Sequence, residues 1–409
     1  MDLKELMSGL AVVIDDALDP EISGDDDGLV DDINDIVALF ESEWCTPFYR
    51  ASQMPPEDVW DNLLTGASFV LLDWKLWQGT ARELERHGTE KNLAFLARAK
   101  DYSVPVLIFT NEDPEDIRHK LERIYKDESL KRSFVFVQAK HELLADGSLN
   151  LDHVREWVRD NASVYVLKRW DRLFREARRS LFTAMYTGSP DWPRVFWRSY
   201  EEDDVDPGLG LTEMINDSLR GRMQANAFDG GLPGSTASMS QEVPREQLRA
   251  LIAATCFVDG LGDSEPRCGD LFKRGGKYLL NIRPDCDCIV RDGGNVADVQ
   301  LYCIEGTKLS DGKLEKKYDK GQGQIVDGIA DAVVFSVVDG KSIWFAFRKL
   351  RVVNYGDLKD RRVGRLLHPY LTRIQQRYAL FLQRQGLPRI PAEAVAKETA
   401  RNLVRDEDE

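Results

Sequence analysis

The chain has 409 residues, with 55 Lys and Arg against 70 Asp and Glu, and a formal net charge of −15. This length predicts two or three domains of ordinary size, and a hydrophobic share of 43% predicts folded cores rather than global disorder. The acidic balance argues against nonspecific binding of duplex DNA by the whole protein, because attraction to phosphates needs a basic surface.

Three features bear on where the protein works. No run of about 18 apolar residues occurs, so we expect no transmembrane helix. Residues 1–10 lack the long apolar stretch and the cleavage site of a signal peptide. Six cysteines are too few for a disulfide-stapled secreted fold of this length. We therefore expect a cytoplasmic protein without membrane contact.

Four short apolar runs alternate with helical stretches in residues 1–160. The runs lack internal polar alternation, which is typical of strands buried on both faces of a parallel sheet. Strands separated by helices predict right-handed crossovers and an α/β, doubly wound parallel sheet. The expected strands are 10–15, 68–74, 104–110 and 133–140, with a weaker fifth candidate at 45–52. The expected helices are 57–64, 81–101 and 114–126.

A helical connector is expected at 161–227. Its apolar residues recur at helical spacing against an Arg-rich polar face, which predicts an amphipathic helix for packing or for homodimer formation. Residues 228–241 are rich in Gly, Ser, Pro and Thr, so we expect a flexible linker there. The apolar residues of the helix are Val164, Leu167, Trp170, Leu173, Phe174 and Leu181.

The last part, residues 242–409, changes character. Short strand-like runs with Gly and Asp turns predict a small, mostly antiparallel β-barrel, and the tripeptide Val-Asp-Gly at 338–340 indicates a hairpin. Apolar residues at helical spacing in 358–386 predict a C-terminal helix that closes the barrel.

Polar side chains stand where the predicted buried strands end. Parallel strands bring their carboxyl ends to one edge of the sheet, where ligands bind, so these side chains should converge. Clustered carboxylates repel one another and favour a hard cation such as Mg²⁺, while hydroxyl and ammonium groups suit phosphoryl oxygens. The set predicts phosphoryl transfer onto a carboxylate. In chain order its members are Asp15 and Asp16, Asp73, Thr110 and Lys140.

This pattern resembles the receiver domain of two-component response regulators. The matching segments are VVIDDA at 12–17, VLLDWKL at 70–76, VLIFTNE at 106–112 and VQAKHE at 137–142. The resemblance covers about residues 8–160 and implies a flavodoxin-like fold for the domain 1–160. It also implies a role for each polar residue. Asp73 would accept the phosphoryl group, Mg²⁺ would be held by Asp15, Asp16, Asp73 and the carbonyl of Lys75, Thr110 would be the switch hydroxyl, and Lys140 would bridge phosphate and acceptor.

The sequence departs from the receiver pattern in several ways. The intervals between the acid pair, Asp73, Thr110 and Lys140 are longer than is usual in the family. His141 stands where a proline usually follows the lysine, and Val137 stands where an aromatic switch residue is usual. These departures leave the coupling to an output open. A degenerate receiver that is never phosphorylated stays an alternative.

Two further clusters invite metal hypotheses. Residues 11–35 hold ten acids and no Lys or Arg, and we expect a solvated loop at 15–36 rather than a second cation site. Cys286 and Cys288 form a CxC pair that lacks the second pair of a zinc ribbon. Cys268 and Cys303 would be needed to complete a site, and we favour ordinary buried thiols.

Arginines are concentrated near the C-terminus, where no acid lies between 361 and 386. They predict contact with an acidic partner, with nucleic acid, or with the acidic N-terminal domain, which we favour. No helix-turn-helix pattern or aromatic stacking platform supports DNA reading, so we do not expect a nucleic-acid partner. The residues are Arg361, Arg362, Arg365, Arg373, Arg377 and Arg384.

The part at 242–409 is similar to SH3-like modules of atypical bacterial receiver proteins. That resemblance implies a histidine kinase or a related GHKL-type ATPase as partner, and a place in antiviral, phage-defence gene clusters. The expected function is a response-regulator-like switch or phosphate sink, not an enzyme. A non-phosphorylated interaction scaffold and a nucleic-acid-binding effector are the alternatives.

Overall fold

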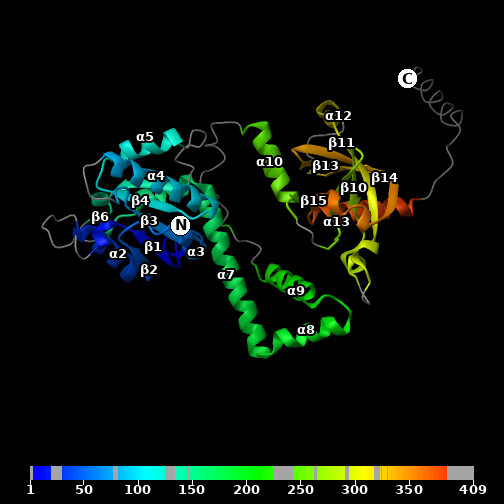
Figure 1. Ribbon diagram of the computed structural model, residues 1–409, viewed down its shortest axis with the longest axis horizontal. Coiled ribbons are helices and arrows are strands. Elements are labelled where there is room, and N and C mark those ends of the chain that lie inside the picture. The colour runs from blue at the N-terminus through cyan, green and yellow to red at the C-terminus, as the bar shows by residue number, and fades with distance from the viewer. Residues whose placement is uncertain are drawn as a thin grey trace, which may run out of the picture. The chain divides into compact units, whose positions relative to one another are not determined.

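The computed structural model describes residues 3–19, 30–76, 82–124, 134–145, 148–223, 228, 243–261, 265–290, 294–316, 323, 325–328 and 330–384. The chain divides into two compact units (Figure 1). The first comprises Met1–Pro193 with Thr212–Ser240, and the second comprises Arg194–Leu211 with Gln241–Glu409. Apart from Phe228, the expected linker at 228–241 lies outside the described residues.

The first unit is built on a five-stranded parallel sheet with the order β2-β1-β3-β4-β5. This is the strand order of flavodoxin-like doubly wound sheets. The weak fifth candidate forms the edge strand β2, whose residues are partly exposed, whereas β1, β3 and β4 are buried along their whole length. The strands are β1 (Ala11–Ile14), β2 (Phe48–Ala51), β3 (Phe69–Leu72), β4 (Val106–Thr110) and β5 (Val135–Ala139).

Helices cover both faces of this sheet. Successive residues of a strand point to opposite faces, so Ala11 and Val13 pack into one core while Val12 and Ile14 pack into the other. Both cores are made of buried apolar side chains, which explains the uninterrupted apolar runs and confirms the α/β layering. The first face carries α1 (Leu3–Leu6), α2 (Val30–Trp44), α6 (Asp152–Asp160) and the start of α7 (Ala162–Gly188); the second carries α3 (Trp60–Gly66), α4 (Arg82–Asp101) and α5 (Pro114–Ile124).

We expected a single solvated loop at 15–36, but the structure differs. Asp16–Leu18 forms a 3-10 turn, η1, and α2 begins at Val30, while residues 20–29 lie outside the described part of the chain. Ile33 and Ile36 are buried against the sheet at helical spacing. The density of acids on the other sides of α2 hides this apolar pattern in the sequence.

The helical region contains α7 and two shorter helices, α8 (Trp192–Glu202) and α9 (Pro207–Arg222). The predicted apolar face of α7 is only partly covered, since Trp170 is 48% and Phe174 38% exposed. Near its C-terminal end, α7 buries Leu181 against Leu219 of α9. None of the helices in the described part of the chain combines the length and apolar character that a bilayer crossing requires.

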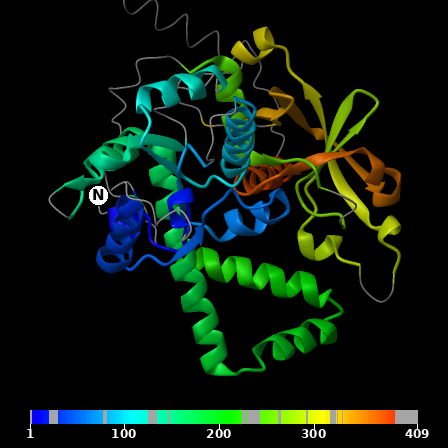
Figure 2. The same cartoon turned by 60° about the vertical axis from the view of Figure 1, so that its left-hand side comes forward.

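The second unit contains an antiparallel sheet that curves into a nearly closed, barrel-like form (Figure 2). Its order is β12-β13-β14-β11-β10-β9-β15-β8. The expected hairpin is confirmed, because Val338 pairs with Lys341 and both turn residues, Asp339 and Gly340, have positive φ. The strands are β8 (Phe257–Val258), β9 (Asp270–Arg274), β10 (Lys277–Asn281), β11 (Gln300–Lys308), β12 (Ile325–Asp327), β13 (Asp331–Val338), β14 (Lys341–Asn354) and β15 (Arg362–Leu366).

Two helices accompany the barrel. α10 (Arg245–Cys256) runs along β13, and α13 (Tyr370–Gln383) fills the main core with Leu371, Ile374 and Phe381. The closing helix is therefore present.

The expected start of the C-terminal helix at 358 is wrong. The helix begins only after Pro369, because proline disfavours a helical residue before it, and residues 362–366 form β15 instead. Arg362 and Arg365 consequently belong to a strand, where they pair with the fully buried Asp270 at 3.6 and 2.7 Å. These two arginines compensate a buried carboxylate and do not contribute to a basic helix face.

Gly269 allows β15 to approach β9. It has a φ of +88°, and a Cβ atom there would lie 2.3 Å from the carbonyl oxygen of Leu366. We predict that Gly269→Ala destabilises the second unit by about 2–4 kcal/mol through backbone strain and overpacking. Hydrogen exchange of β9 and β15 amides in increasing urea measures this change. Gly312→Ala is the control, because its Cβ would meet nothing within 4 Å; equal stability of the two variants contradicts the prediction.

Candidate functional site

All five predicted polar residues lie at the carboxyl edge of the parallel sheet. The backbone holds two of them there, because Asp15 N–H donates to Ala51 O at 3.0 Å and Asp73 N–H donates to Ile14 O at 2.8 Å. These bonds continue the strand pairing one step beyond β1 and β3. Lys140 follows directly after the last residue of β5. The strand ends therefore bring together residues that are far apart in the sequence.

Lys140 links the two buried aspartates. Its Nζ atom lies 2.7 Å from Oδ2 of Asp15 and 3.5 Å from Oδ2 of Asp73, and all three side chains are almost fully buried. The other oxygen of Asp15 accepts from the N–H of Ala17 at 3.0 Å and so caps η1. A buried ammonium group is stable only when paired, so the two carboxylates and the lysine form one electrostatic unit.

The three carboxylates make a cation site of suitable composition. Oxygen atoms of Asp15, Asp16 and Asp73 all lie within 4.8 Å of one another. With all groups ionised, Lys140 offsets only one of the three negative charges. Hard divalent cations such as Mg²⁺ take carboxylate oxygens together with waters. These donors therefore fit Mg²⁺, which would neutralise the remaining charge.

Burial perturbs the acids of this site. It raises the pKa of Asp73 to about 7, and the neighbouring Asp15 and Asp16 add to the rise while Lys140 opposes it. Burial, with the charge of Asp15, also raises the pKa of Asp16. The pKa of Lys140 is raised as well, since the attraction of Asp73 and Asp15 outweighs its own burial. The lysine stays protonated, whereas Asp73 titrates near neutral pH when no cation is bound.

Thr110 and Lys75 lie beside this unit. Thr110 ends β4, is fully buried, and pairs with Ala139, the residue before Lys140. Its hydroxyl oxygen accepts from the N–H of Glu112 at 3.1 Å, so its own hydrogen can donate to another group. The backbone N–H of Lys75 donates to the carboxylate of Asp73. A role of the Lys75 carbonyl as a cation ligand stays a prediction.

Asn92 is a positioning residue that sequence reasoning missed. It lies on α4, is 1% exposed, and donates from Nδ2 to the carbonyl of Trp74 at 2.7 Å. This bond fixes the backbone next to Asp73, and the buried indole of Trp74 packs into the core below. The available signal was a single amide in the apolar helix face NLAFLA at 92–97.

The cysteines do not assemble a metal site in the part of the chain that the structure describes. Cys268, Cys288 and Cys303 are buried free thiols, and Cys286 is exposed. Burial raises the pKa of Cys288 to about 11 and that of Cys303 to about 12, so their thiolate forms are disfavoured. Asp15, Asp16 and Asp73 are the one group of possible metal ligands found among the described residues.

Comparison of the chain with protein-family models, with curated proteins and with solved structures finds no match in any of the three. The assignment of this site therefore rests on its geometry and on the chemistry of its residues.

The raised pKa of Asp73 makes stability depend on pH. The folded state favours the neutral acid, so the protein loses stability as Asp73 ionises. This loss grows from about pH 4 to about pH 7 and is complete above pH 7. We predict that Asp73→Asn stabilises the metal-free protein at about pH 8 by on the order of 2–4 kcal/mol, and by roughly a third of that near pH 5. Thermal melting in a chelator at both pH values measures this difference.

Asp35→Asn is the matched control, because Asp35 lies exposed on α2 and the substitution makes the same change in charge. A stabilisation by Asp73→Asn that is the same at both pH values, or that equals the effect of the control, contradicts the prediction.

Proposed function

We propose that the first unit accepts a phosphoryl group on the carboxylate of Asp73 and acts as a response-regulator-like switch or phosphate sink. The observation that carries this proposal is the Lys140 ammonium group, which lies 3.5 Å from Asp73 and 2.7 Å from Asp15 at the sheet edge. A nucleophilic carboxylate with an adjacent fixed cation matches the needs of phosphoryl transfer. The proposed donor is a phosphohistidine on a histidine kinase or a related ATPase.

The transfer makes one bond and breaks one. An oxygen of Asp73 forms a bond to phosphorus while the bond from phosphorus to the donor nitrogen breaks. The nitrogen keeps the electron pair and is neutralised by a proton. Asp73 must be ionised to attack, and Lys140 favours that form. The backbone bond from Asp73 N–H to Ile14 O and the side-chain bond from Asn92 Nδ2 to Trp74 O hold the nucleophile in position.

Two other groups serve the incoming phosphoryl group. Lys140 is placed to pair with its oxygens, and the Thr110 hydroxyl can donate to one of them. When bound by Asp15, Asp16 and Asp73, Mg²⁺ supplies the positive charge that lets an anionic donor approach three carboxylates. In the proposal the second unit is the output, as an SH3-like interaction module.

Acetyl phosphate and beryllofluoride test phosphate acceptance directly. We predict that the full chain incubated with acetyl phosphate and Mg²⁺ gains hydroxylamine-labile phosphate, and that beryllofluoride with Mg²⁺ changes the fluorescence of Trp74, which follows the acceptor. Asp73→Asn abolishes both responses, whereas Asp35→Asn keeps them. Trp74→Phe removes the spectral change but retains the phosphate.

The alternative of a non-phosphorylated scaffold makes the opposite prediction. A wild-type chain that gains no phosphate and gives no response to beryllofluoride would falsify phosphate acceptance. In that case Asp73→Asn leaves partner binding intact, and the acids and Lys140 only stabilise the fold.

A further inference from the structure

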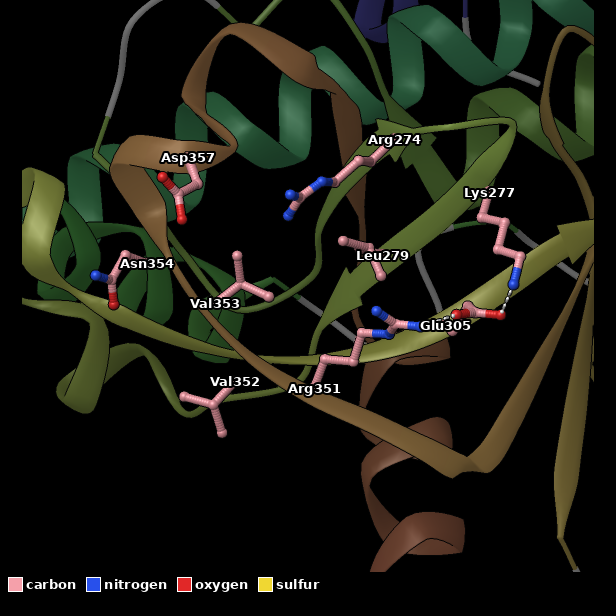
Figure 3. A pocket seen from close by; sticks show the side chains of 9 residues that line it. All are labelled: Arg274, Lys277, Leu279, Glu305, Arg351, Val352, Val353, Asn354 and Asp357. Carbon is pink, nitrogen blue, oxygen red and sulfur yellow. Dashed lines mark hydrogen bonds and ion pairs between the residues drawn. The ribbon is translucent and has the colours of Figure 1, made fainter.

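A charged cavity opens on the sheet of the second unit, away from the main barrel core. It has a volume of about 690 Å³, and its lining includes Arg274, Lys277, Glu305, Arg351 and Asp357 (Figure 3). These residues come from β9, β10, β11, β14 and the turn after β14. Neither the acceptor site nor its proposed function uses any of them.

Glu305 organises the cations of this cavity. It is only 4% exposed, yet its carboxylate forms ion pairs with Lys277 at 2.5 Å, Arg351 at 3.0 Å and Lys349 at 3.2 Å. Hydrogen bonding from Lys277 lowers the pKa of Glu305, so it is ionised at neutral pH. One buried carboxylate thus draws cations from two strands to a single point, where they would otherwise repel one another.

Positive charge remains after this pairing. Arg274 points into the cavity in Figure 3, and among the described residues it has neither a hydrogen bond nor an ion pair. Among the described lining residues, Arg274, Lys277 and Arg351 stand against two acids, Glu305 and Asp357. Lys349, which pairs with Glu305 from outside the lining, raises the excess to two positive charges. Three of these cations, at Lys277, Lys349 and Arg351, are 46–62% exposed at their side chains and so can also reach a ligand.

The local excess contrasts with the rest of the chain. Residues 1–240 hold 27 Lys and Arg against 45 Asp and Glu, whereas residues 241–409 hold 28 against 25. The C-terminal part is therefore close to neutral, with a net charge of +3. A surface that binds nucleic acid along its length is expected to be far more basic.

Size and lining favour a small ligand. The volume lies within the range of small-molecule pockets, roughly 300–1,000 Å³. Neighbouring strands are about 4.8 Å apart, so the cations from β9 to β14 span roughly 14 Å, enough for a chain of linked phosphates. Among the described residues, the lining offers apolar Leu279, Val352 and Val353 but no aromatic side chain on which a base could stack.

We propose that this cavity binds a small polyphosphate, a ligand with two or more linked phosphate groups. The Arg274 and Arg351 guanidinium groups suit phosphate because their planar forks can donate two parallel hydrogen bonds. Lys277 and Lys349 contribute as point charges. Glu305 is a positioning residue that holds three of the four cations together.

Isothermal titration of the full chain with inorganic tripolyphosphate tests the proposal. The titration is done in a chelator, so that the acceptor site carries no cation and repels anions. We expect saturable binding of one tripolyphosphate per chain that weakens as salt is added. Arg274→Gln and Arg351→Gln should each weaken binding roughly tenfold. Asp73→Asn should bind tripolyphosphate as tightly as wild type, because Asp73 does not line the cavity. A failure to bind tripolyphosphate is therefore distinct from a failure to accept a phosphoryl group.

Lys273→Gln and Arg348→Gln are the controls. They remove the same charge from β9 and β14 at exposed residues outside the cavity lining. Equal weakening by the controls, or no saturable binding by wild-type protein that melts normally, overturns the proposal. It is also overturned if a short oligothymidylate competes and binds more tightly than tripolyphosphate, because the surface would then serve nucleic acid.

Discussion

The buried triad of Lys140, Asp15 and Asp73 is the interaction on which the first unit depends. The lysine follows β5 and the two carboxylates follow β1 and β3, and all three side chains are almost fully withdrawn from water. The buried ammonium group of Lys140 is tolerable only because carboxylates pair with it. The compensation is incomplete, since Asp16 adds a further negative charge and the pKa of Asp73 is raised to about 7. The three carboxylates therefore suit a cation, and the ammonium group of Lys140 suits an anionic group.

In the second unit the charge balance is reversed, because basic side chains outnumber the buried acids that they pair with. Glu305 and Asp270 are buried acids, and each is surrounded by more basic groups than it can neutralise. At Asp270 the arginines are withdrawn from solvent, which makes the cluster structural. At Glu305 the two lysines and one arginine remain accessible to solvent, as a ligand-binding cluster requires. The net charge of −15 for the whole chain does not reveal this contrast between an acidic cluster in the first unit and basic clusters in the second.

Local patterns were sufficient to predict some features and insufficient for others. The acids and Lys140 could be placed because parallel strands end at one edge, whatever the length of the intervening helices. Asn92 was missed because its role depends on the carbonyl of Trp74, which no residue pattern encodes. Arg362 and Arg365 were assigned to a helix because their partner Asp270 lies about 90 residues away in the chain. The Glu305 cavity likewise depends on strand pairings between distant segments.

We infer that Asp15, Asp16 and Asp73 form a divalent-cation site, because Lys140 offsets only one of their three negative charges. Calorimetric titration of the full chain with Mg²⁺ near pH 7, in two buffers of different ionisation enthalpy, tests it most directly. We predict one strong site per chain, release of protons as Asp73 ionises, and loss of the site in Asp15→Asn. Binding without proton release, binding that survives Asp15→Asn, or no binding at all would contradict the account.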